Sequence, residues 1–270
     1  MKLQKYSKQL LSLVLGLVLL LSPVMLQHVC AAASNTGKAY HWYVKRNNEH
    51  KQPLADRQQA FFEKYDAYYI DKKHGDTAED KVIYLTFDAG YENGNVVKIL
   101  DVLRKEEVPA AFFVLKNILL NERSLVERMI NEGHLVCNHT KNHKDMSCSS
   151  REEFSAELNG LADIYREQTG KDMPRYYRPP EGKYSEDNLK YAQELGYKTI
   201  FWSFAYADWD NDKQPSAEEA KKKIIDNMHN GAVLLLHPTS ATNAAILGDL
   251  IQQWKAEGYR FGTLDELVAR

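Results

Sequence analysis

The chain has little net charge, few cysteines and no internal repeat. Its 35 Lys and Arg residues nearly balance 37 Asp and Glu residues, for a net charge of −2, which is not the cationic surplus of a nucleic-acid-binding protein. Two of its three cysteines, Cys137 and Cys148, flank a pair of histidines. They could form a disulfide in an exported protein or remain buried thiols. No low-complexity linker divides the sequence, so its 270 residues indicate one domain or at most two.

The long apolar run of the sequence lies at the N-terminus. Residues 1–8 hold three lysines, residues 10–26 hold no charge, and small residues follow at 31–34. This order predicts a signal peptide cleaved after residue 33, which would change the net charge from −2 to −5. An uncleaved anchor is the alternative, because the run approaches the length that spans a bilayer. Either way, we expect the remaining chain to lie outside the cytoplasm, without tight membrane association once the signal is removed.

Three segments with different patterns follow one another. Residues 1–33 are the expected signal peptide, residues 34–80 a polar and aromatic N-terminal extension, and residues 81–270 a regular domain. The aromatic cluster at 41–43 is expected to pack the extension onto the domain.

Strands and helices alternate through the domain. Short β-branched, aromatic or aliphatic runs predict strands at 82–87, 110–115, 134–138, 176–177, 198–202, 232–237 and 259–261. Helical spacing and capping boxes predict helices at 94–107, 124–133, 150–170, 185–195 and 243–256, with two more beginning at 216 and 264. Aliphatic strands that alternate with helices indicate an α/β fold with a parallel sheet, and about seven such units favour a closed or nearly closed barrel.

Polar residues follow several of these strands. In such barrels the active site lies at the C-terminal ends of the strands. Asp88, His139, Arg178 and His237 stand at four strand ends, and Asp208 lies just beyond a fifth. A single Asp after a strand is commonly a turn residue, but five ionisable positions on one rim predict an active site.

The residue types at this rim indicate a hydrolase. His143 lies four residues after His139, and on a helical turn this spacing puts both imidazoles within reach of one cation such as zinc. Asp88 can serve as the base for a water and His237 as the acid for a leaving group. Arg178 can orient a carboxylate, either that of Asp88 or one on the substrate. Together these roles describe metal-assisted hydrolysis of an amide or ester.

Five motifs stand in order along the chain: Thr86-Phe87-Asp88-Ala89-Gly90, His139-Thr140-Lys141-Asn142-His143, Arg178-Pro179-Pro180, Asp208-Trp209 and Leu235-Leu236-His237. They resemble the motifs of the polysaccharide deacetylases of carbohydrate esterase family 4, the NodB-homology family, over roughly residues 80–265. The resemblance implies a distorted (β/α)7 barrel with an N-terminal extension. It also implies an N-deacetylase with Asp88 as base, His237 as acid, and His139 and His143 as metal ligands. We expect Arg178 to be a further catalytic residue, as the group that orients a carboxylate.

Three positions depart from the family pattern. Ala89 replaces a second aspartate that ligates metal, Ala205 replaces the first aspartate of the fourth motif, and Glu181 replaces a common tyrosine. Two histidines completed by water bind a metal less tightly than three protein ligands. A divalent metal, with zinc preferred, is therefore the expected cofactor, and Ala89 puts its requirement in question.

The segment from Asp88 to Gly94 is similar to the branch that deacetylates muramic acid residues of spore-cortex peptidoglycan. In that branch the reaction leads to muramic δ-lactam after an amidase has removed the peptide stem. The similarity implies a monomer acting on glycan strands in the cell wall or intermembrane space of a spore-forming bacterium. The residues expected to bind substrate are Arg178, Pro180, Tyr91, Glu92, Asn93, Asp208 and Trp209.

Three alternatives remain open on sequence. The chain could deacetylate N-acetylglucosamine polymers, or it could be an inactive barrel that only binds glycan, as Ala89 would allow. It could also be a glycosidase that pairs Asp88 with Glu92 or Glu181, although the two histidines have no role in that reaction.

Overall fold

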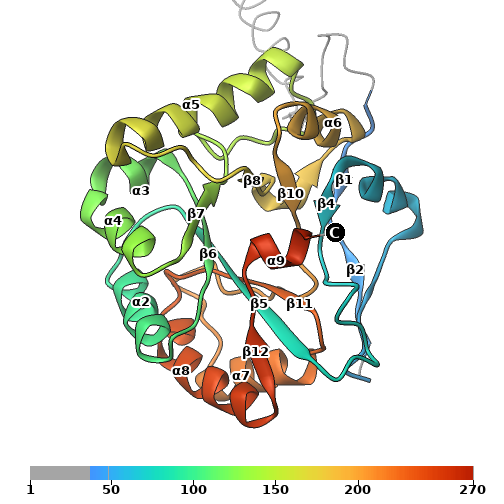
Figure 1. Cartoon of the computed structure of the whole chain (residues 1–270), viewed down its shortest axis with the longest axis vertical. Helices are drawn as coiled ribbons and strands as arrows, with labels where there is room; N and C mark the ends of the chain where they lie inside the picture. The colour runs from blue at the N-terminus through green and yellow to red at the C-terminus, as the bar shows by residue number, and fades with distance from the viewer. Residues whose placement is uncertain (1–36, 48, 270) are drawn as a thin grey trace, which may run out of the picture. The chain divides into compact units, whose positions relative to one another are not determined.

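The computed structural model describes residues 37–47 and 49–269, so the expected signal peptide lies outside the described residues. A curled parallel sheet forms the centre of the fold, in the order β11-β5-β6-β7-β8-β10-β4 (Figure 1). An eighth strand, β12 (Tyr259–Phe261), pairs with the start of β5. The bounds in chain order are β4 Ala67–Tyr68, β5 Lys81–Ala89, β6 Ala111–Val114, β7 Leu135–Asn138, β8 Tyr176–Tyr177, β10 Lys198–Ile200 and β11 Ala232–Leu236.

The two sides of the sheet meet where the chain leaves β10. The amide of Ser203 donates to the carbonyl of Val233, and the amide of Leu235 donates to the carbonyl of Phe204, each at 2.9 Å. A further bridge joins Ile70, just after β4, to Ala232 at the start of β11. The parallel barrel expected from the sequence is therefore confirmed.

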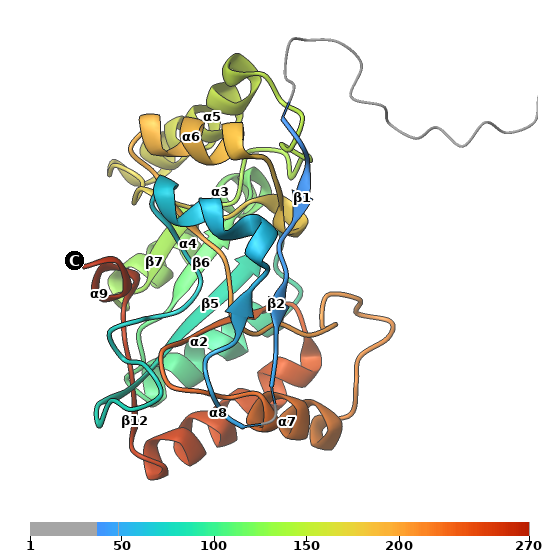
Figure 2. The same cartoon turned by 90° about the vertical axis from the view of Figure 1, so that its right-hand side faces the viewer.

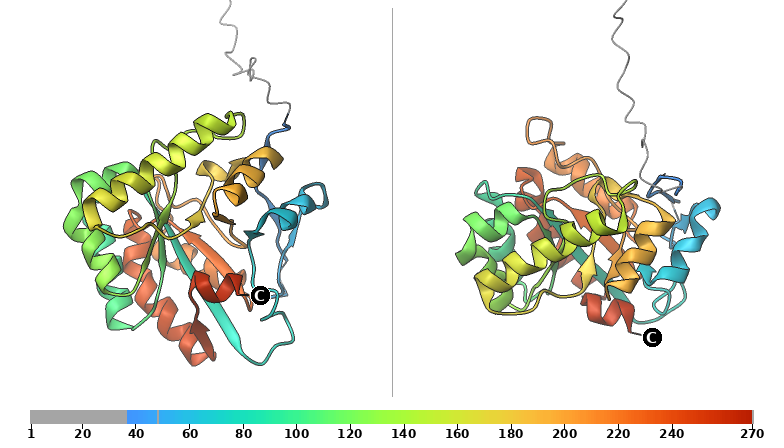
Figure 3. Two further views of the ribbon diagram at one scale, coloured as in Figure 1. Left: turned by 45° about the horizontal axis from the view of Figure 1, so that its top comes forward. Right: turned by 90° about the horizontal axis from the view of Figure 1, so that it is seen from above.

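Helices cover the outside of this barrel (Figure 3). Ser150 and Glu153 form the expected capping box at the start of α5, and Ser216 and Glu219 form another at the start of α7. These reciprocal hydrogen bonds satisfy amides that a helix start leaves free. The helices are α2 Asn95–Lys105, α3 Lys116–Asn121, α4 Arg123–Asn131, α5 Arg151–Thr169, α6 Glu186–Glu194, α7 Ala217–Asp226, α8 Ala241–Ala256 and α9 Leu264–Val268.

Strand β5 shows how the core is divided. Its residues Ile83, Leu85 and Phe87 pack in the cluster that includes the buried faces of α2 and α8. Its alternate residues Val82 and Tyr84 belong to a second cluster with side chains of β6, β7 and β10. Because successive side chains of a strand point to opposite faces, one apolar strand supplies both layers.

Residues 37–47 and 49–80, the N-terminal segment, pack along the barrel (Figure 2). It contains β1 (Tyr40–His41), β2 (Val44–Lys45), β3 (Leu54–Ala55) and the 3₁₀ helix η1 (Arg57–Tyr65). The Trp42 ring stacks on Phe201 at 4.2 Å between centroids, and its indole N–H donates to the carbonyl of Trp202 at 2.8 Å. The same segment also contributes β4 to the main sheet, through parallel pairing with β10.

Cys137 is a free thiol buried in the barrel, so the disulfide with Cys148 that the sequence left open does not form. Burial raises the pKa of this thiol, which makes it an apolar packing residue. Within residues 37–47 and 49–269, the helices are too short or too polar to cross a lipid bilayer.

Gly231 allows the N-terminal segment to approach β11, and this predicts a stability effect. Its φ is +70°, and a Cβ there would lie 2.5 Å from the carbonyl oxygen of Asp71. Gly196 has φ +78° but open space around it, so Gly196→Ala should cost only the left-handed backbone penalty of about 1–2 kcal/mol. Gly231→Ala should cost at least about 1 kcal/mol more, because the backbone must also shift. Urea unfolding of both variants measures the difference, and equal losses would contradict the close-approach argument.

Candidate active site

A cavity of about 650 Å³ lies at the C-terminal ends of the barrel strands. Segments following β5, β7, β8, β10 and β11 all contribute to it, as the rule for such barrels predicts. The lining residues are Asp88, Gly90, Tyr91, His139, His143, Glu181, Trp202, Ala205, Tyr206, Trp209, Leu235, His237 and Thr239.

A buried ion pair lies beneath this cavity. The Nη1 of Arg178 donates to Oδ1 of Asp88 at 2.8 Å, and the guanidinium is fully buried. Burial alone would raise the pKa of Asp88, but the charges of His139, Arg178 and His237 outweigh it and lower that pKa. Arg178 is the partner among these three that stays charged at any ordinary pH, so it helps to keep Asp88 ionised and able to accept a proton.

The remaining contacts of Arg178 fix its position. Its Nε donates to the carbonyl of Ile200 at 3.0 Å and its Nη2 donates to Oγ1 of Thr86 at 2.8 Å. Its guanidinium carbon lies 4.1 Å from the centroid of the Phe113 ring. Because its guanidinium has no exposed surface, Arg178 orients Asp88 and has no access to a carboxylate on a substrate.

His139 and His143 come together through a turn, so the expectation of a helical turn is wrong. Thr140 and His143 have positive φ values of 69° and 55°. The side chain of Asn138 accepts from the amide of Thr140, whose own hydroxyl accepts from the amide of His143. The two imidazole centroids lie 5.0 Å apart, so the four-residue spacing gives the expected proximity by a different backbone path.

The tautomer of His139 is set by a backbone carbonyl. Its Nδ1 lies 2.9 Å from the carbonyl oxygen of Arg178, which can only accept, so Nδ1 carries the hydrogen. Burial lowers the pKa of His139 to about 4. The neutral ring therefore presents the lone pair of Nε2 to the site, 3.4 Å from Oδ2 of Asp88.

His237 is held by a second buried carboxylate. Its Nδ1 lies 2.7 Å from Oδ1 of Asp208, and its backbone amide donates to Oδ2 of the same carboxylate at 2.8 Å. Asn243 also donates to Oδ2 at 2.6 Å and is held in turn by Tyr206. Burial would lower the pKa of His237, but the hydrogen bond and charge of Asp208 raise it. The imidazole is thus prepared to donate a proton.

The expected substrate-binding residues divide into two groups. Tyr91 and Trp209 line the cavity and are 49% and 61% exposed. The other five do not line it. Glu92 accepts from the amides of Gly94 and Val96 at the start of α2, Asn93 donates to the carbonyl of Thr239, and Pro180, Arg178 and Asp208 are buried.

Several lining residues were absent from the expected binding set. Glu181 stands in the left-handed conformation at φ 56° within the short 3₁₀ helix η2 (Pro180–Gly182), and Lys183 pairs with it at 2.8 Å. Trp202 and Tyr206 come from the segment after β10. The clearest available signal was their closeness in sequence to the Arg-Pro-Pro and Asp-Trp motifs.

The described residues only partly fit a metal site. No group of three His, Cys, Asp or Glu side chains able to hold a metal occurs among them. His139 and His143 offer two imidazoles, and the contact of His139 with the Arg178 carbonyl is the outer hydrogen bond common to metal-bound histidine. Ala89 is fully buried in the outer core. The protein thus offers two imidazoles, and solvent or substrate would have to supply the remaining ligands.

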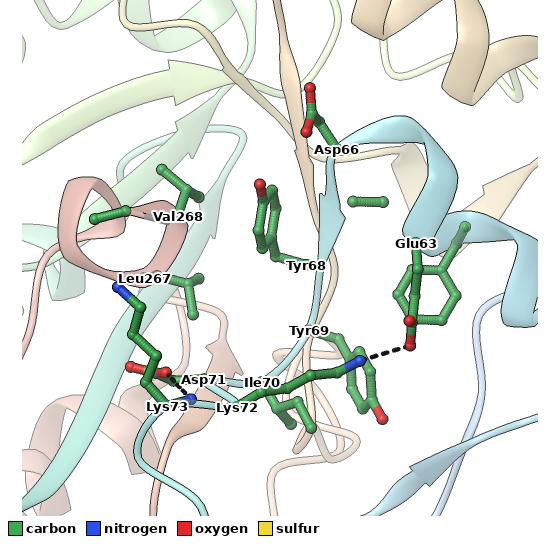
Figure 4. Close-up of a pocket in the computed structure, with 13 residues that line it drawn as sticks. Glu63, Asp66, Tyr68, Tyr69, Ile70, Asp71, Lys72, Lys73, Leu267 and Val268 are labelled. Carbon is green, nitrogen blue, oxygen red and sulfur yellow. Dashed lines mark hydrogen bonds and ion pairs between the residues drawn. The ribbon is translucent and has the colours of Figure 1, made fainter.

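A second cavity of about 460 Å³ shares no lining residue with the first. It lies between residues 62–73 and the end of α9, and Lys72 reaches across its edge to Glu63 at 2.7 Å (Figure 4). Its lining combines apolar side chains with paired charges and contains none of the motif residues, so the first cavity remains the candidate active site.

Comparisons with known proteins identify relatives of this chain. A family model described as polysaccharide deacetylase matches residues 75–200. The peptidoglycan N-acetylmuramic acid deacetylase PdaA of Bacillus subtilis is 41% identical over 84% of this chain and 85% of its own length. A solved structure of that protein, a family 4 carbohydrate esterase, superposes with a TM-score of 0.79 at 39% identity, covering 85% of this chain and 97% of that one. A family 4 carbohydrate esterase from Bacillus anthracis superposes with a TM-score of 0.68 at 35% identity, covering 83% and 98%.

The His237–Asp208 pair predicts a measurable titration. The pKa of His237 in the folded protein should lie above the ordinary value of about 6.5, and Asp208→Asn should lower it. Because the folded pKa is raised, the pair stabilises the fold fully below about pH 6.5 and loses this contribution as pH rises through the folded pKa. NMR titration of the imidazole checks the shift, with Asp212→Asn, an exposed loop position, as control. An unchanged pKa in Asp208→Asn would contradict the assignment.

Proposed function

Since the chain belongs to the polysaccharide deacetylases of carbohydrate esterase family 4, we propose that it removes the N-acetyl group from muramic acid residues of peptidoglycan. The muramic assignment rests on the 41% identical relative that carries this activity in its name. The observation that carries the chemistry is a carboxylate with a lowered pKa and an imidazole with a raised pKa lining one cavity.

Asp88 acts as the general base in this proposal. It removes a proton from a water molecule as the water oxygen attacks the acetyl carbon. His237, charged at the start, then gives its Nε2 proton to the departing nitrogen. The carbon–nitrogen bond breaks, acetate leaves, and the sugar keeps a free amine. Asp208 holds the imidazole in the tautomer that this transfer requires.

His139 and His143 would hold a divalent metal, with zinc best suited to two imidazoles. Such an ion, when bound, polarises the acyl oxygen and acidifies water. The Arg178 carbonyl keeps the His139 ring turned toward the site, and Thr140 fixes the backbone of His143.

Exposed aromatic side chains would bind the sugar. Tyr91 and Trp209 line the cavity with much of their surface free, and Trp209 lies 6.2 Å from the His237 ring between centroids. Rings in such positions can stack on sugar faces while leaving the polar groups free to orient the acetamide.

The alternatives have less support. The carboxylate of Glu92 accepts a hydrogen bond from the amide of Gly94 at the start of α2, and Glu181 pairs with Lys183. Neither is therefore a good second carboxylate for a glycosidase. An inactive barrel would not need the two buried pairs Asp88–Arg178 and His237–Asp208, which lower the pKa of Asp88 and raise the pKa of His237. N-acetylglucosamine polymers remain the second candidate substrate, since another relative at 34% identity is named a peptidoglycan N-acetylglucosamine deacetylase.

We place this activity outside the cytoplasm, with residues 1–33 as a cleaved signal peptide and the protein acting as a monomer on glycan strands. Formation of muramic δ-lactam in spore cortex is the proposed outcome of the reaction. The free amine left by deacetylation and the lactyl carboxyl of the same sugar are the two groups that such a lactam joins.

Asp88→Asn should abolish acetate release. The amide cannot take the proton from water, so the rate should fall by about 10²–10⁴-fold. The assay measures acetate from peptide-free glycan strands, together with loss of N-acetylmuramic acid from them. Asp212→Asn removes an exposed carboxylate outside the cavity lining and should leave the rate unchanged. Wild-type protein that releases no acetate from any strand would overturn the proposal.

Metal removal should lower the activity, and added zinc should restore it. Two imidazoles hold a metal weakly, so dialysis against a chelator should be sufficient and activity should fall at least about tenfold. His143→Ala should abolish the response to zinc, whereas His41→Ala, an exposed histidine in β1, should keep it. Activity that is insensitive to chelator in both the wild type and His143→Ala would show that the histidines do not serve a metal.

A further inference from the structure

An exposed cation of the N-terminal segment contacts a residue that lines the active-site cavity, although it is not itself part of the lining. Arg46 follows β2, and its Nη2 donates to the carbonyl oxygen of Ala205 at 2.6 Å. The guanidinium carbon lies 5.0 Å from the centroid of the buried Phe204 ring. Ala205 is itself a lining residue, so these two contacts hold a planar cation against the backbone of one residue of the cavity lining.

The charge of Arg46 has no carboxylate partner within ion-pair distance in the part of the chain that the structure describes. By contrast, Lys183 pairs with Glu181 at 2.8 Å and with Asp145 at 3.5 Å, and Arg178 pairs with Asp88. The alanine at 205 supplies only a backbone oxygen to Arg46. One hydrogen bond leaves most of the five N–H donors of a guanidinium available.

We propose that Arg46 is a specificity-determining residue that binds the lactyl carboxylate of muramic acid, an inference that rests on the proposed function. A muramic acid residue differs from glucosamine by this carboxylate. A guanidinium offers two parallel donors that match the two carboxylate oxygens.

The proposal explains why a free lactyl group should matter. In a strand with its peptide stem, the lactyl carboxyl is joined in an amide and carries no charge. Such a sugar offers one carbonyl oxygen to Arg46 instead of a bidentate anion.

The test compares glycan strands with a free lactyl carboxylate against the same strands converted to the lactyl carboxamide, using the full mature chain. Arg46→Gln should lower kcat/KM on the carboxylate strands by about 10- to 100-fold, the range expected for a charged hydrogen bond. Most of the change should appear in KM, because the contact lies away from the reacting bond. The wild type should lose a similar factor on the carboxamide strands, and Arg46→Gln should lose little more.

Two further variants sharpen the result. Arg46→Lys keeps the charge without the planar fork and should recover part of the loss. Lys45→Gln removes an exposed charge one residue away in β2 and should behave as wild type. Equal losses by Arg46→Gln on both strands, or no loss on either, would overturn the assignment. Unfolding midpoints of all variants verify that they are folded.

Failure of the proposed function would look different. Wild-type protein would then release no acetate from either strand. Equilibrium binding of N-acetylmuramic acid and of its carboxamide would still test Arg46 in that case. Tighter binding of the acid by the wild type, lost in Arg46→Gln, would support the assignment, and equal binding of the two sugars would refute it.

Discussion

The buried guanidinium of Arg178 is the interaction on which the site depends. A charge without solvent is costly unless a partner and hydrogen bonds compensate it. Here Asp88 supplies the charge, while Thr86 and the carbonyl of Ile200 supply hydrogen bonds. These contacts join β5, β8 and β10 at the level where the cavity begins. The carbonyl of Arg178 in turn sets the tautomer of His139. One buried cation therefore fixes the base and one of the two histidines together.

The long elements could be predicted from the sequence because their signals are local. The aliphatic run of β11 and the capping boxes of α5 and α7 each lie within a few residues. Strand β4 could not be predicted, because two residues in an aperiodic segment become a strand only by pairing with β10. The turn from His139 to His143 depends on hydrogen bonds from Asn138 and Thr140, and a spacing of four residues reads equally well as a helix.

Site residues could be predicted from the sequence where their signal is local, and could not be predicted where their position depends on contacts with distant segments. Asp88, His139 and His237 stand at strand ends, so the barrel rule places them on one rim. Glu92 and Asn93 share the polarity of binding residues, yet their side chains are used within the loop and helix start. Arg46 contacts the cavity-lining residue Ala205 although the two lie 159 positions apart along the chain. Only the packing of the N-terminal segment on the barrel brings these two residues together.

The two carboxylates, Asp88 and Asp208, have opposite effects because their partners differ. Asp88 faces a guanidinium that stays charged, so its own pKa falls and it remains a base. Asp208 faces the imidazole of His237, which can titrate. Its negative charge therefore raises the pKa of His237 and favours the protonated imidazole. Burial strengthens both effects by removing competing water. The division into base and acid is therefore made by the protein's own charges, before any metal is considered. Alanine stands at position 89 in this chain. The two ion pairs would therefore set the protonation of the proposed base and acid whether or not His139 and His143 hold a metal.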